Sequence, residues 1–274
     1  MLSLIKVEWL KLRKYKAFWW MLAIAIITYP SINIFFRGIY GTVTDRKGVE
    51  GEVFKGLIGN PFAFPEVWHS VAYFSSWLLV VPSLLIIMII TNEYTYKTNK
   101  QNIIDGWSRS EFILSKLYDV LVISTIISIV YIIITVVFGI RYSSEFQITR
   151  WDEQIKYVFL FFLQTFAQLT IAFFVGFILK RSFIALGVFI FYLIVVEPIL
   201  GSIFKYYFKL PALANFLPLE ISDKLIPPAA FLGKFNKEAY EQSLADINMH
   251  ILYTCLLTAA VWFLCIRIYK KRDL

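Results

Sequence analysis

The sequence of 274 residues contains few of the side chains on which redox and metal chemistry depend, with only two cysteines and two histidines. Cys255 and Cys265 stand in one apolar run. On a single helix, that spacing holds the two sulfurs too far apart for a disulfide bond. We therefore expect no disulfide framework, and we assign both cysteines to packing.

The sequence also lacks the short motifs that carry common enzyme chemistry. It contains no GxxxxGK[ST] loop for phosphate binding, no HExxH zinc motif and no GxSxG nucleophile motif. We therefore expect that the chain is not an enzyme by itself, hydrolyses no nucleotide and binds no cofactor. Any energy that it uses has to come from a partner.

Apolar residues are abundant instead. They make up 59% of the chain, aromatic residues make up 18%, and the mean hydropathy is +0.67. Soluble domains are roughly 45–50% apolar even when glycine is counted. The composition thus predicts an integral membrane protein, with the lipid bilayer as its surroundings.

Six apolar runs have about the 20 residues that a helix needs to cross the hydrocarbon core. We predict an all-α polytopic membrane protein in which residues 1–274 form a single transmembrane domain. The predicted spans are 18–36, 70–91, 120–140, 157–179, 183–204 and 250–268. The last is the shortest, and Arg267 is expected to extend outward from it toward the interface.

The first residues form a separate element. Residues 1–17 carry five basic side chains against the single acid Glu8, and apolar residues recur at helical spacing. This pattern predicts a basic amphipathic helix lying in the membrane interface. A cleaved signal peptide is disfavoured, because the basic region is long and no small-residue cleavage site follows the apolar run.

The distribution of charge predicts the orientation. The formal net charge is +8, and most Lys and Arg residues lie in the short segments that share a side with both ends of the chain. Most acidic residues lie on the other side. The positive-inside rule then predicts a multi-pass protein of the inner (plasma) membrane with both termini cytoplasmic. Since the charge follows topology, we expect no nucleic acid partner.

The outer connections differ in character. The glycine-rich segment Arg37–His69 is expected to be loose. The longest connection, 205–249, is apolar in its first half and contains four prolines. Two of its stretches, Leu213–Leu219 and Ile226–Leu232, are too short to span and are predicted as re-entrant or interfacial helices buried in protein.

The elbow, residues 92–116, is the most informative polar stretch. Residues 92–105 contain no proline or glycine and are predicted to be helical, and Gly106 stands where a helix end favours a left-handed residue. Ser108 with Glu111 three residues later predicts a capping box that starts a second helix. Two interpretations remain open: a rigid docking element for a partner, or a solvated loop held by its own caps.

This layout resembles the permease subunits of ABC transporters of the type-2 exporter class (ABC-2 type). That family has an interfacial N-terminal helix, six spans, a cytoplasmic coupling elbow between spans two and three, and a re-entrant element between spans five and six. The residues that carry the resemblance are Glu93, Thr98, Gly106, Ser108, Arg109 and Glu111. The family often has glycine directly before its threonine, where this chain has Lys97.

The resemblance implies an ATP-driven exporter. A separate cytoplasmic ABC ATPase subunit would bind ATP and Mg²⁺, and a second permease copy or homologous permease would complete the pathway. Gln101 and Asp105 join the residues above as the expected ATPase-coupling set. The absence of a charged tunnel favours an amphipathic cargo that is lipid-like, peptide or drug-like. The alternative is a non-transport membrane immunity or sensor protein that acts by binding a peptide or a partner.

Polar residues inside or beside the spans form a second set of candidates. Glu197 and Pro198, near the outer end of the fifth span, are interpreted as the lining or gate of an outward cavity, or else as a carboxylate that reaches headgroups and water. Pro198 is also expected to kink its helix. Gln164 and Gln168, one turn apart, are interpreted as interhelical hydrogen-bonding residues.

The histidines are the last candidates. His69 and His250 each stand at the outer end of a predicted span, with Met249 beside the second. Imidazole and thioether groups suit copper, but two isolated histidines are more typical of the interface than of a metal site. We expect no metal.

Overall fold

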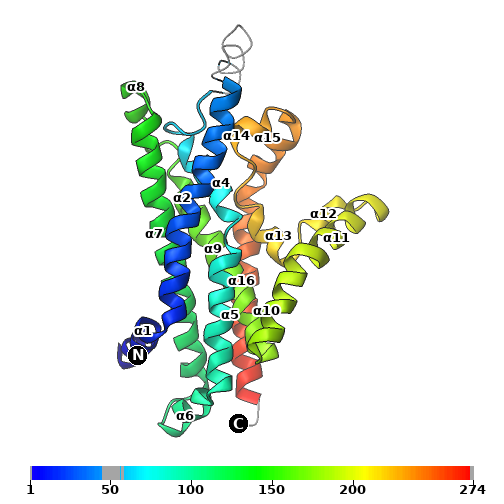
Figure 1. Cartoon of the computed structure of the whole chain (residues 1–274). Coiled ribbons are helices and arrows are strands. Elements are labelled where there is room, and N and C mark those ends of the chain that lie inside the picture. Colours follow the sequence, from blue (N-terminus) through cyan, green and yellow to red (C-terminus); the bar gives the residue numbers. More distant parts are fainter. Residues whose placement is uncertain (1, 45–55, 57–58, 272–274) are drawn as a thin grey trace.

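The protein is described here by a computed structural model that covers residues 2–44, 56 and 59–271. Within these residues there is no β-strand, and nearly all of the chain is helical. Long helices run side by side along one axis, and a shorter arm leaves the bundle (Figure 1). The all-α architecture that the composition predicts is therefore confirmed.

Among the described residues, five helices are long and apolar enough to cross a membrane. They are α2 (Lys16–Thr44), α7 (Arg109–Tyr142), α9 (Lys156–Leu179), the arm (Ser182–Tyr207) and α16 (Ile247–Lys271). A pair of shorter helices, α4 (Val67–Ser76) and α5 (Val80–Thr95), meets the same criteria together but bends by 50° between its two parts. Each of the six predicted runs falls on one of these elements.

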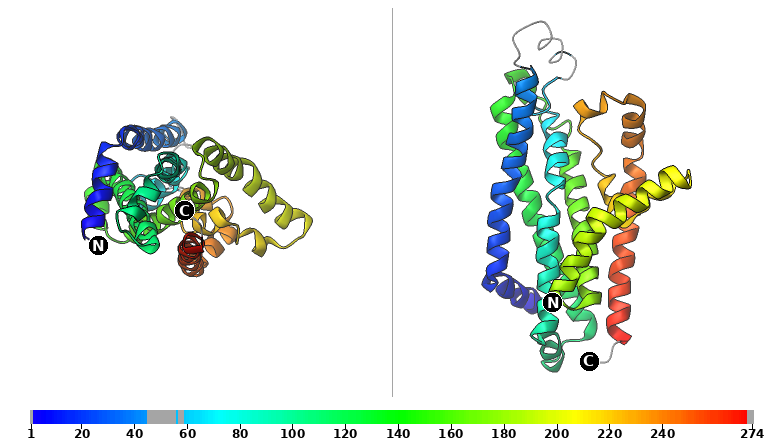
Figure 2. Two further views of the ribbon diagram at one scale, coloured as in Figure 1. Left: turned by 90° about the horizontal axis from the view of Figure 1, so that it is seen from below. Right: turned by 45° about the vertical axis from the view of Figure 1, so that its right-hand side comes forward.

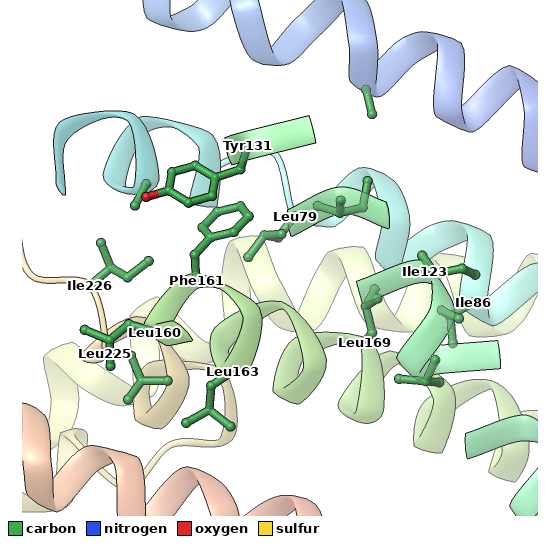
Figure 3. Packing of buried hydrophobic residues seen from close by; sticks show 14 of the residues in the cluster. Leu79, Ile86, Ile123, Tyr131, Leu160, Phe161, Leu163, Leu169, Leu225 and Ile226 are labelled. Atoms are coloured by element: carbon green, nitrogen blue, oxygen red, sulfur yellow. The ribbon is translucent and has the colours of Figure 1, made fainter. Parts of the chain in front are cut away.

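Helix α9 lies at the centre of the bundle and packs against α4, α5, α7, α10 and α16. In its most apolar window 67% of the residues are buried, against at most 44% in the other four long helices. Tyr131 of α7 stacks on Phe161 of α9 with ring centroids 4.5 Å apart, and Leu79, Ile86 and Leu169 continue the same core (Figure 3). A helix with apolar residues on most of its faces is expected at the centre of a bundle, because other helices can then cover it on all sides.

Gly176 sets the approach of α5 to α9. A Cβ atom at this position would come within 3.3 Å of the Ile87 Cα atom and would meet the Ile90 side chain at a still shorter distance. The absence of a side chain thus lets the two helix backbones pack closely, as small residues do in membrane bundles.

The N-terminal helix α1 (Leu2–Lys14) lies across the end of the bundle rather than along it (Figure 2). Tyr15 separates it from α2, and the Tyr15 hydroxyl accepts a hydrogen bond of 2.8 Å from the Asn92 amide on α5. The amphipathic helix predicted over 1–17 therefore exists, although it ends three residues earlier. α1, the end of α16 and the elbow all lie at the same end of the molecule (Figure 1).

The prediction that Arg37–His69 is loose is wrong for the part that the structure describes. α2 continues to Thr44, and Phe62 and Ala63 are fully buried. The Asn60 amide donates to the Tyr142 carbonyl at 3.0 Å, which fixes this segment to the end of α7. Hydrogen bonding of the backbone to distant side chains gives a glycine-rich segment a definite conformation. Residues 45–55 and 57–58 lie outside the described residues.

The arm contains the helices α10 (Ser182–Phe191) and α11 (Glu197–Ser202) and two π-helical segments, η1 (Tyr192–Val196) and η2 (Ile203–Tyr207). It diverges from the bundle toward the end opposite the elbow (Figures 1 and 2). Pro198 cannot donate a backbone hydrogen bond, and η1 ends at Val196, two residues before it. A local change of helical register is a common response to such a missing donor.

Beyond the arm the chain forms four short helices: α12 (Pro211–Ala214), α13 (Pro218–Asp223), α14 (Ala230–Gly233) and α15 (Lys237–Ala245). The two predicted short helices are thus misplaced. Pro218 begins a helix inside the stretch 213–219, and most of 226–232 is not helical. Proline is favoured in the first turn of a helix and disrupts a helix interior. The prolines therefore set helix boundaries in this region that hydropathy alone does not predict.

Candidate functional site

The elbow forms a short helix between two long ones. α5 ends at Thr95, Lys97 takes a left-handed conformation with φ of 56°, and α6 (Thr98–Ile104) follows. The single helix predicted over 92–105 is therefore interrupted. α6 ends at Ile104, two residues before Gly106, whose φ of 98° is left-handed as predicted. Its amide and that of Trp107 donate to the carbonyls of Ile103 and Asn102 at 3.1 and 3.0 Å, the two hydrogen bonds of a Schellman motif.

The start of α7 is capped from both sides. The Ser108 hydroxyl accepts from the Glu111 amide at 3.2 Å, and the Glu111 carboxylate accepts from the Ser108 amide at 2.8 Å. This is the predicted capping box, and it satisfies two amides that the helix leaves unbonded. Arg109 donates to the Lys270 carbonyl at 2.6 Å, which joins the start of α7 to the end of α16.

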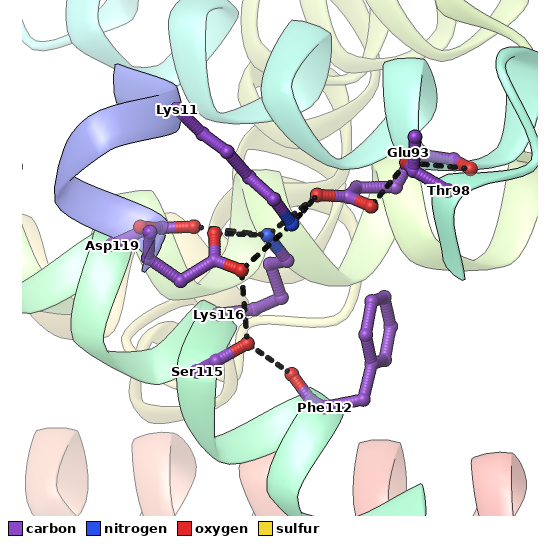
Figure 4. A network of polar contacts seen from close by, with 8 residues as sticks. Lys11, Glu93, Thr98, Phe112, Ser115, Lys116 and Asp119 are labelled. Carbon is purple, nitrogen blue, oxygen red and sulfur yellow. Dashed lines mark hydrogen bonds and ion pairs between the residues drawn. The ribbon is translucent and has the colours of Figure 1, made fainter. Parts of the chain in front are cut away.

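A cluster of five charged residues, four of them buried and one half-buried, lies behind the elbow (Figure 4). We call it the ion cluster: Glu8 and Lys11 of α1, Glu93 of α5, and Lys116 and Asp119 of α7. The Lys116 ammonium donates to one carboxylate on each helix, at 2.5 Å to Glu8, 2.8 Å to Glu93 and 3.3 Å to Asp119. Lys11 donates to Glu8 at 3.0 Å and to Glu93 at 3.1 Å.

Burial makes the stability of the protein sensitive to the loss of any one charge in the ion cluster. Lys116 and Glu8 are each 1% exposed, so water cannot replace a lost partner. Removing one member of a buried ion pair typically costs several kcal/mol, because the remaining charge is left unsolvated. Burial alone would raise the pKa of Glu8, but Lys116 and Lys11 outweigh it and hold that pKa below its usual value. Glu8 is therefore an anion that fixes α1 to the bundle.

The ion cluster also holds the start of α6. The Thr98 hydroxyl donates to the Glu93 carboxylate oxygen Oε2, while Oε1 of the same carboxylate faces the two lysines (Figure 4). A cavity of about 300 Å³ adjoins the cluster between α1, α5 and α7. α1, α5, α6 and α7 are thus joined through one carboxylate, so a displacement of α6 is opposed by all four elements.

The predicted coupling residues divide into two groups. Glu93 is buried and Thr98 is half-buried, so both position the elbow rather than face a partner. Gln101, Asp105, Gly106 and Ser108 are exposed, and Arg109 and Glu111 are half-buried. The sequence analysis missed two strongly exposed side chains with apolar surface in the elbow, Tyr96 at 74% and Ile104 at 83% exposure. An isoleucine in a polar helix outside the spans was the available signal.

A second candidate site lies between the arm and the bundle, at the other half of the molecule. It is a cavity of about 1090 Å³, which we call the arm cavity, and it is bounded by α4, α5, α9, the arm, α13 and α15. Glu197 and Pro198 are part of its wall, as are Gln164, Gln168 and Asp223.

Helix α13 is held in place by polar contacts on both sides. From the arm, Glu197 Oε1 accepts the backbone amides of Leu219 and Glu220 at 2.9 and 2.8 Å. From the bundle, the amides of Gln164 and Gln168 donate to Asp223 Oδ1 at 2.9 and 2.6 Å. Gln164 and Gln168 are thus interhelical hydrogen-bonding residues, as predicted. Glu197 is buried, so it does not reach headgroups and water at a surface.

The comparison with known families now adds one finding. Residues 52–274 match the sequence model of the family described as "Protein of unknown function (DUF2705)". The chain belongs to the DUF2705 family. No curated protein matches it. The family match covers the elbow, Glu93, Lys116, Asp119 and the arm cavity, whereas Glu8 and Lys11 precede its first matched residue.

In this DUF2705 protein the two histidines are internal structural residues. The His69 ring stacks on Tyr157 at 4.2 Å, and its Nε2 lies 2.8 Å from the Pro227 carbonyl. The His250 Nδ1 lies 3.2 Å from the Ile221 carbonyl. Both are buried rather than interfacial. Among the described residues, no group of three or more His, Cys, Asp or Glu side chains is arranged to hold a metal ion.

Four members of the ion cluster were also missed as site residues. Glu8 was noticed only as the single acid of its segment, and Lys11 only as one of its basic residues. Lys116 and Asp119 lie three residues apart at the start of an apolar helix, where charged side chains are costly unless paired. That cost was a usable signal, although it does not identify the partners on α1 and α5.

Proposed function

We propose that this protein is the membrane-spanning permease subunit of an ATP-driven ABC exporter of the ABC-2 type. In this proposal α2, the bent pair α4–α5, α7, α9, the arm and α16 are six spans, and both termini are cytoplasmic in the inner (plasma) membrane. The observation that carries the proposal is α6, an exposed helix that is fixed to three other helices through the ion cluster.

The elbow has the physical properties that a coupling element needs. It exposes the large side chains of Tyr96 and Ile104 together with the polar Gln101 and Asp105, and these mixed side chains are available to a protein partner. α6 is joined at its start to Glu93 and at its end to the capped α7, a helix of 34 residues and about 50 Å. A force on α6 would therefore move α5 and α7 together.

The partner that exerts this force is proposed to be a cytoplasmic ABC ATPase that binds ATP and Mg²⁺, and the chain itself hydrolyses nothing. Two permease subunits, identical or homologous, would enclose the pathway, because one such bundle leaves little room for a wide polar route. ATPase closure would rock α5 and α7, and the cargo would be amphipathic, lipid-like, peptide or drug-like. Nucleic acid has no part in this mechanism.

The test is co-purification of an ATPase with the tagged protein, with its native neighbouring genes intact and with or without a non-hydrolysable ATP analogue. The elbow variant is the double substitution Ile104→Ser and Asp105→Ala. Its matched control is Arg150→Ala with Glu153→Ala, which removes an exposed ion pair of 2.6 Å elsewhere in the chain.

We expect a Walker-motif ATPase to co-purify with wild type and with the control, and at least tenfold less with the elbow variant. Purification of stable wild-type protein with no ATPase would contradict the proposal. That result would favour the alternative, a membrane immunity or sensor protein that acts by binding a peptide or a partner.

A further inference from the structure

The arm cavity contains acceptor oxygens that have no donor. Gln164 is 1% exposed, and both it and Gln168 direct an amide nitrogen at Asp223, because a carboxylate accepts only hydrogen-bond donors. The Gln164 oxygen Oε1 is therefore turned away from Asp223, and it has no hydrogen-bond partner. A buried polar atom without a partner is uncommon and costly in a folded protein.

Glu197, another residue of the cavity wall, has a second such oxygen. The residue is 6% exposed, and Oε1 is used by the two amides of α13. Oε2 accepts no hydrogen bond of regular geometry, although the Tyr192 hydroxyl interacts with the carboxylate. Both unpartnered atoms are acceptors, so the missing group is a donor.

The charged side chains of the cavity wall also favour a ligand that donates hydrogen bonds. The cavity is lined by four acidic and two basic side chains. One acid, Glu220, is paired with Lys224 at 3.3 Å, and Lys205 lies over the ring of Tyr206 at 5.3 Å. Among the described residues, no salt bridge neutralises Glu197, Asp223 or Asp246, all of which belong to the cavity wall. Carboxylates without an ion-pair partner in a protected cavity favour a cation that donates hydrogen bonds.

The remaining wall is apolar. Tyr73 and Trp77 of the α4 region, Val80 of α5 and Leu193 of the arm face the same space. An aromatic and aliphatic surface beside carboxylates suits a molecule with one cationic end and one apolar end.

We propose that the arm cavity binds an amphipathic primary amine, with its ammonium between Glu197, Gln164 and Asp223 and its apolar body against Trp77 and Leu193. A primary ammonium has three donors: two would meet the unpartnered oxygens of Gln164 and Glu197, and the third would meet the Asp223 carboxylate, which already accepts from the two glutamines. This assignment rests on the proposed function, because it identifies the amine as the class of cargo. The binding test itself does not need the ATPase.

The probe is dansylcadaverine, a primary amine with an aromatic body, titrated against the full-length protein in nanodiscs and followed by dansyl fluorescence. Its N-acetylated analogue keeps the body and removes the charge. We expect saturable binding of the amine and at least tenfold weaker binding of the analogue. Equal binding of the two compounds, or no saturable binding of the amine, would overturn the proposal.

Three variants locate the binding site. Glu197→Gln retains an acceptor for α13 and removes the charge, so we expect roughly tenfold weaker amine binding. Gln164→Lys places a tethered ammonium beside Asp223 and is expected to abolish binding while preserving the fold, as shown by an unchanged melting temperature. The control, Glu220→Gln, removes an acid that is already paired and should change binding less than threefold. Unchanged binding in the first two variants would overturn the assignment.

The outcomes also separate this inference from the proposed function. Loss of the ATPase partner with intact amine binding would refute the exporter and leave the amine site standing. An ATPase that co-purifies with a protein that binds no amine would refute only the amine site.

Discussion

Lys116 is the residue on which the elbow end of the molecule depends. Its ammonium is 1% exposed and lies among three carboxylates from three helices. Such a charge depends on its carboxylate partners, because the residue is almost entirely removed from solvent. The ion cluster is thus a fixed joint between α1, α5 and α7, and single changes within it should be more damaging than changes on the exposed face of α6.

The first prediction follows from this burial. Lys116→Met should lower the free energy of unfolding by about 3–5 kcal/mol, because it leaves buried carboxylates without their main cation. Lys100→Met, a lysine exposed on α6, should change it by less than about 0.5 kcal/mol. Denaturant unfolding in detergent measures both. Equal effects of the two substitutions would show that the ion cluster does not stabilise the fold.

Glu8 leads to a prediction about pH. Its pKa in the folded protein lies below the ordinary value of 4.5. The stabilisation it provides is therefore fully present above that pH and is lost as the pH falls through the lowered pKa. As the pH falls below about 4.5, the thermal midpoint of wild type should fall more steeply than that of Glu8→Gln. Parallel curves would contradict the ionised state of Glu8.

At the scale of elements, the two ends of α6 show what short sequence patterns can predict. The left-handed Gly106 and the Ser108–Glu111 capping box were predictable, because each depends on neighbours within a few residues. The break at Lys97 was not, because nothing in the local composition requires a left-handed lysine there. Residue propensities predict a helix end at a glycine far better than they predict a left-handed conformation at any other residue.

The ion cluster and the arm cavity show why the rest could not be predicted. Glu8 and Lys116 are 108 positions apart, and Lys11 and Glu93 are 82 apart. No periodicity or motif links such partners; only the packing of α1 across the bundle brings them together. Similarly, hydropathy suggested re-entrant helices but could not show that Glu197 would accept the amides of α13.

The prediction at this scale concerns the end of α6. Gly106→Ala forces a residue with a Cβ to hold φ at 98°, so it should destabilise the protein by about 1 kcal/mol or more and weaken ATPase co-purification. Gly38→Ala is the matched control, since Gly38 lies inside α2 with open space around its Cα and the change should be neutral or slightly stabilising. Melting temperatures and pull-down yields compare the two. A harmless Gly106→Ala would show that the Schellman turn does not set the position of α6.

At the scale of the whole molecule, the bundle divides into two halves with different chemistry. One half holds α1, the elbow and the ion cluster, and the other holds the arm cavity (Figures 1 and 2). α5 and α7 extend from the half that holds the ion cluster toward the other half, and α5 also borders the arm cavity. Movement of α6 would in this arrangement reach the cavity through α5. The chain therefore offers a direct mechanical link between the proposed docking site and the proposed cargo site.

The topology is tested by cysteine labelling with a membrane-impermeant maleimide. In a background with Cys255 and Cys265 replaced by serine, Gln101→Cys should be labelled only from the cytoplasm, and Gln147→Cys only from outside. These positions lie on α6 and α8 (Glu145–Ile148), at opposite ends of α7. Labelling of both from the same side would mean that α7 does not span the membrane and would contradict the six-span arrangement.

The most direct measurement of the central claim, that α6 receives an ATPase, is site-specific photo-crosslinking in cells. A photoreactive amino acid is placed at Gln101, which is exposed on α6, and in a control at Glu153, which is exposed elsewhere. The account predicts an adduct with a Walker-motif ATPase from position 101 and none from position 153. No ATPase adduct at position 101, or equal adducts at both positions, would contradict it.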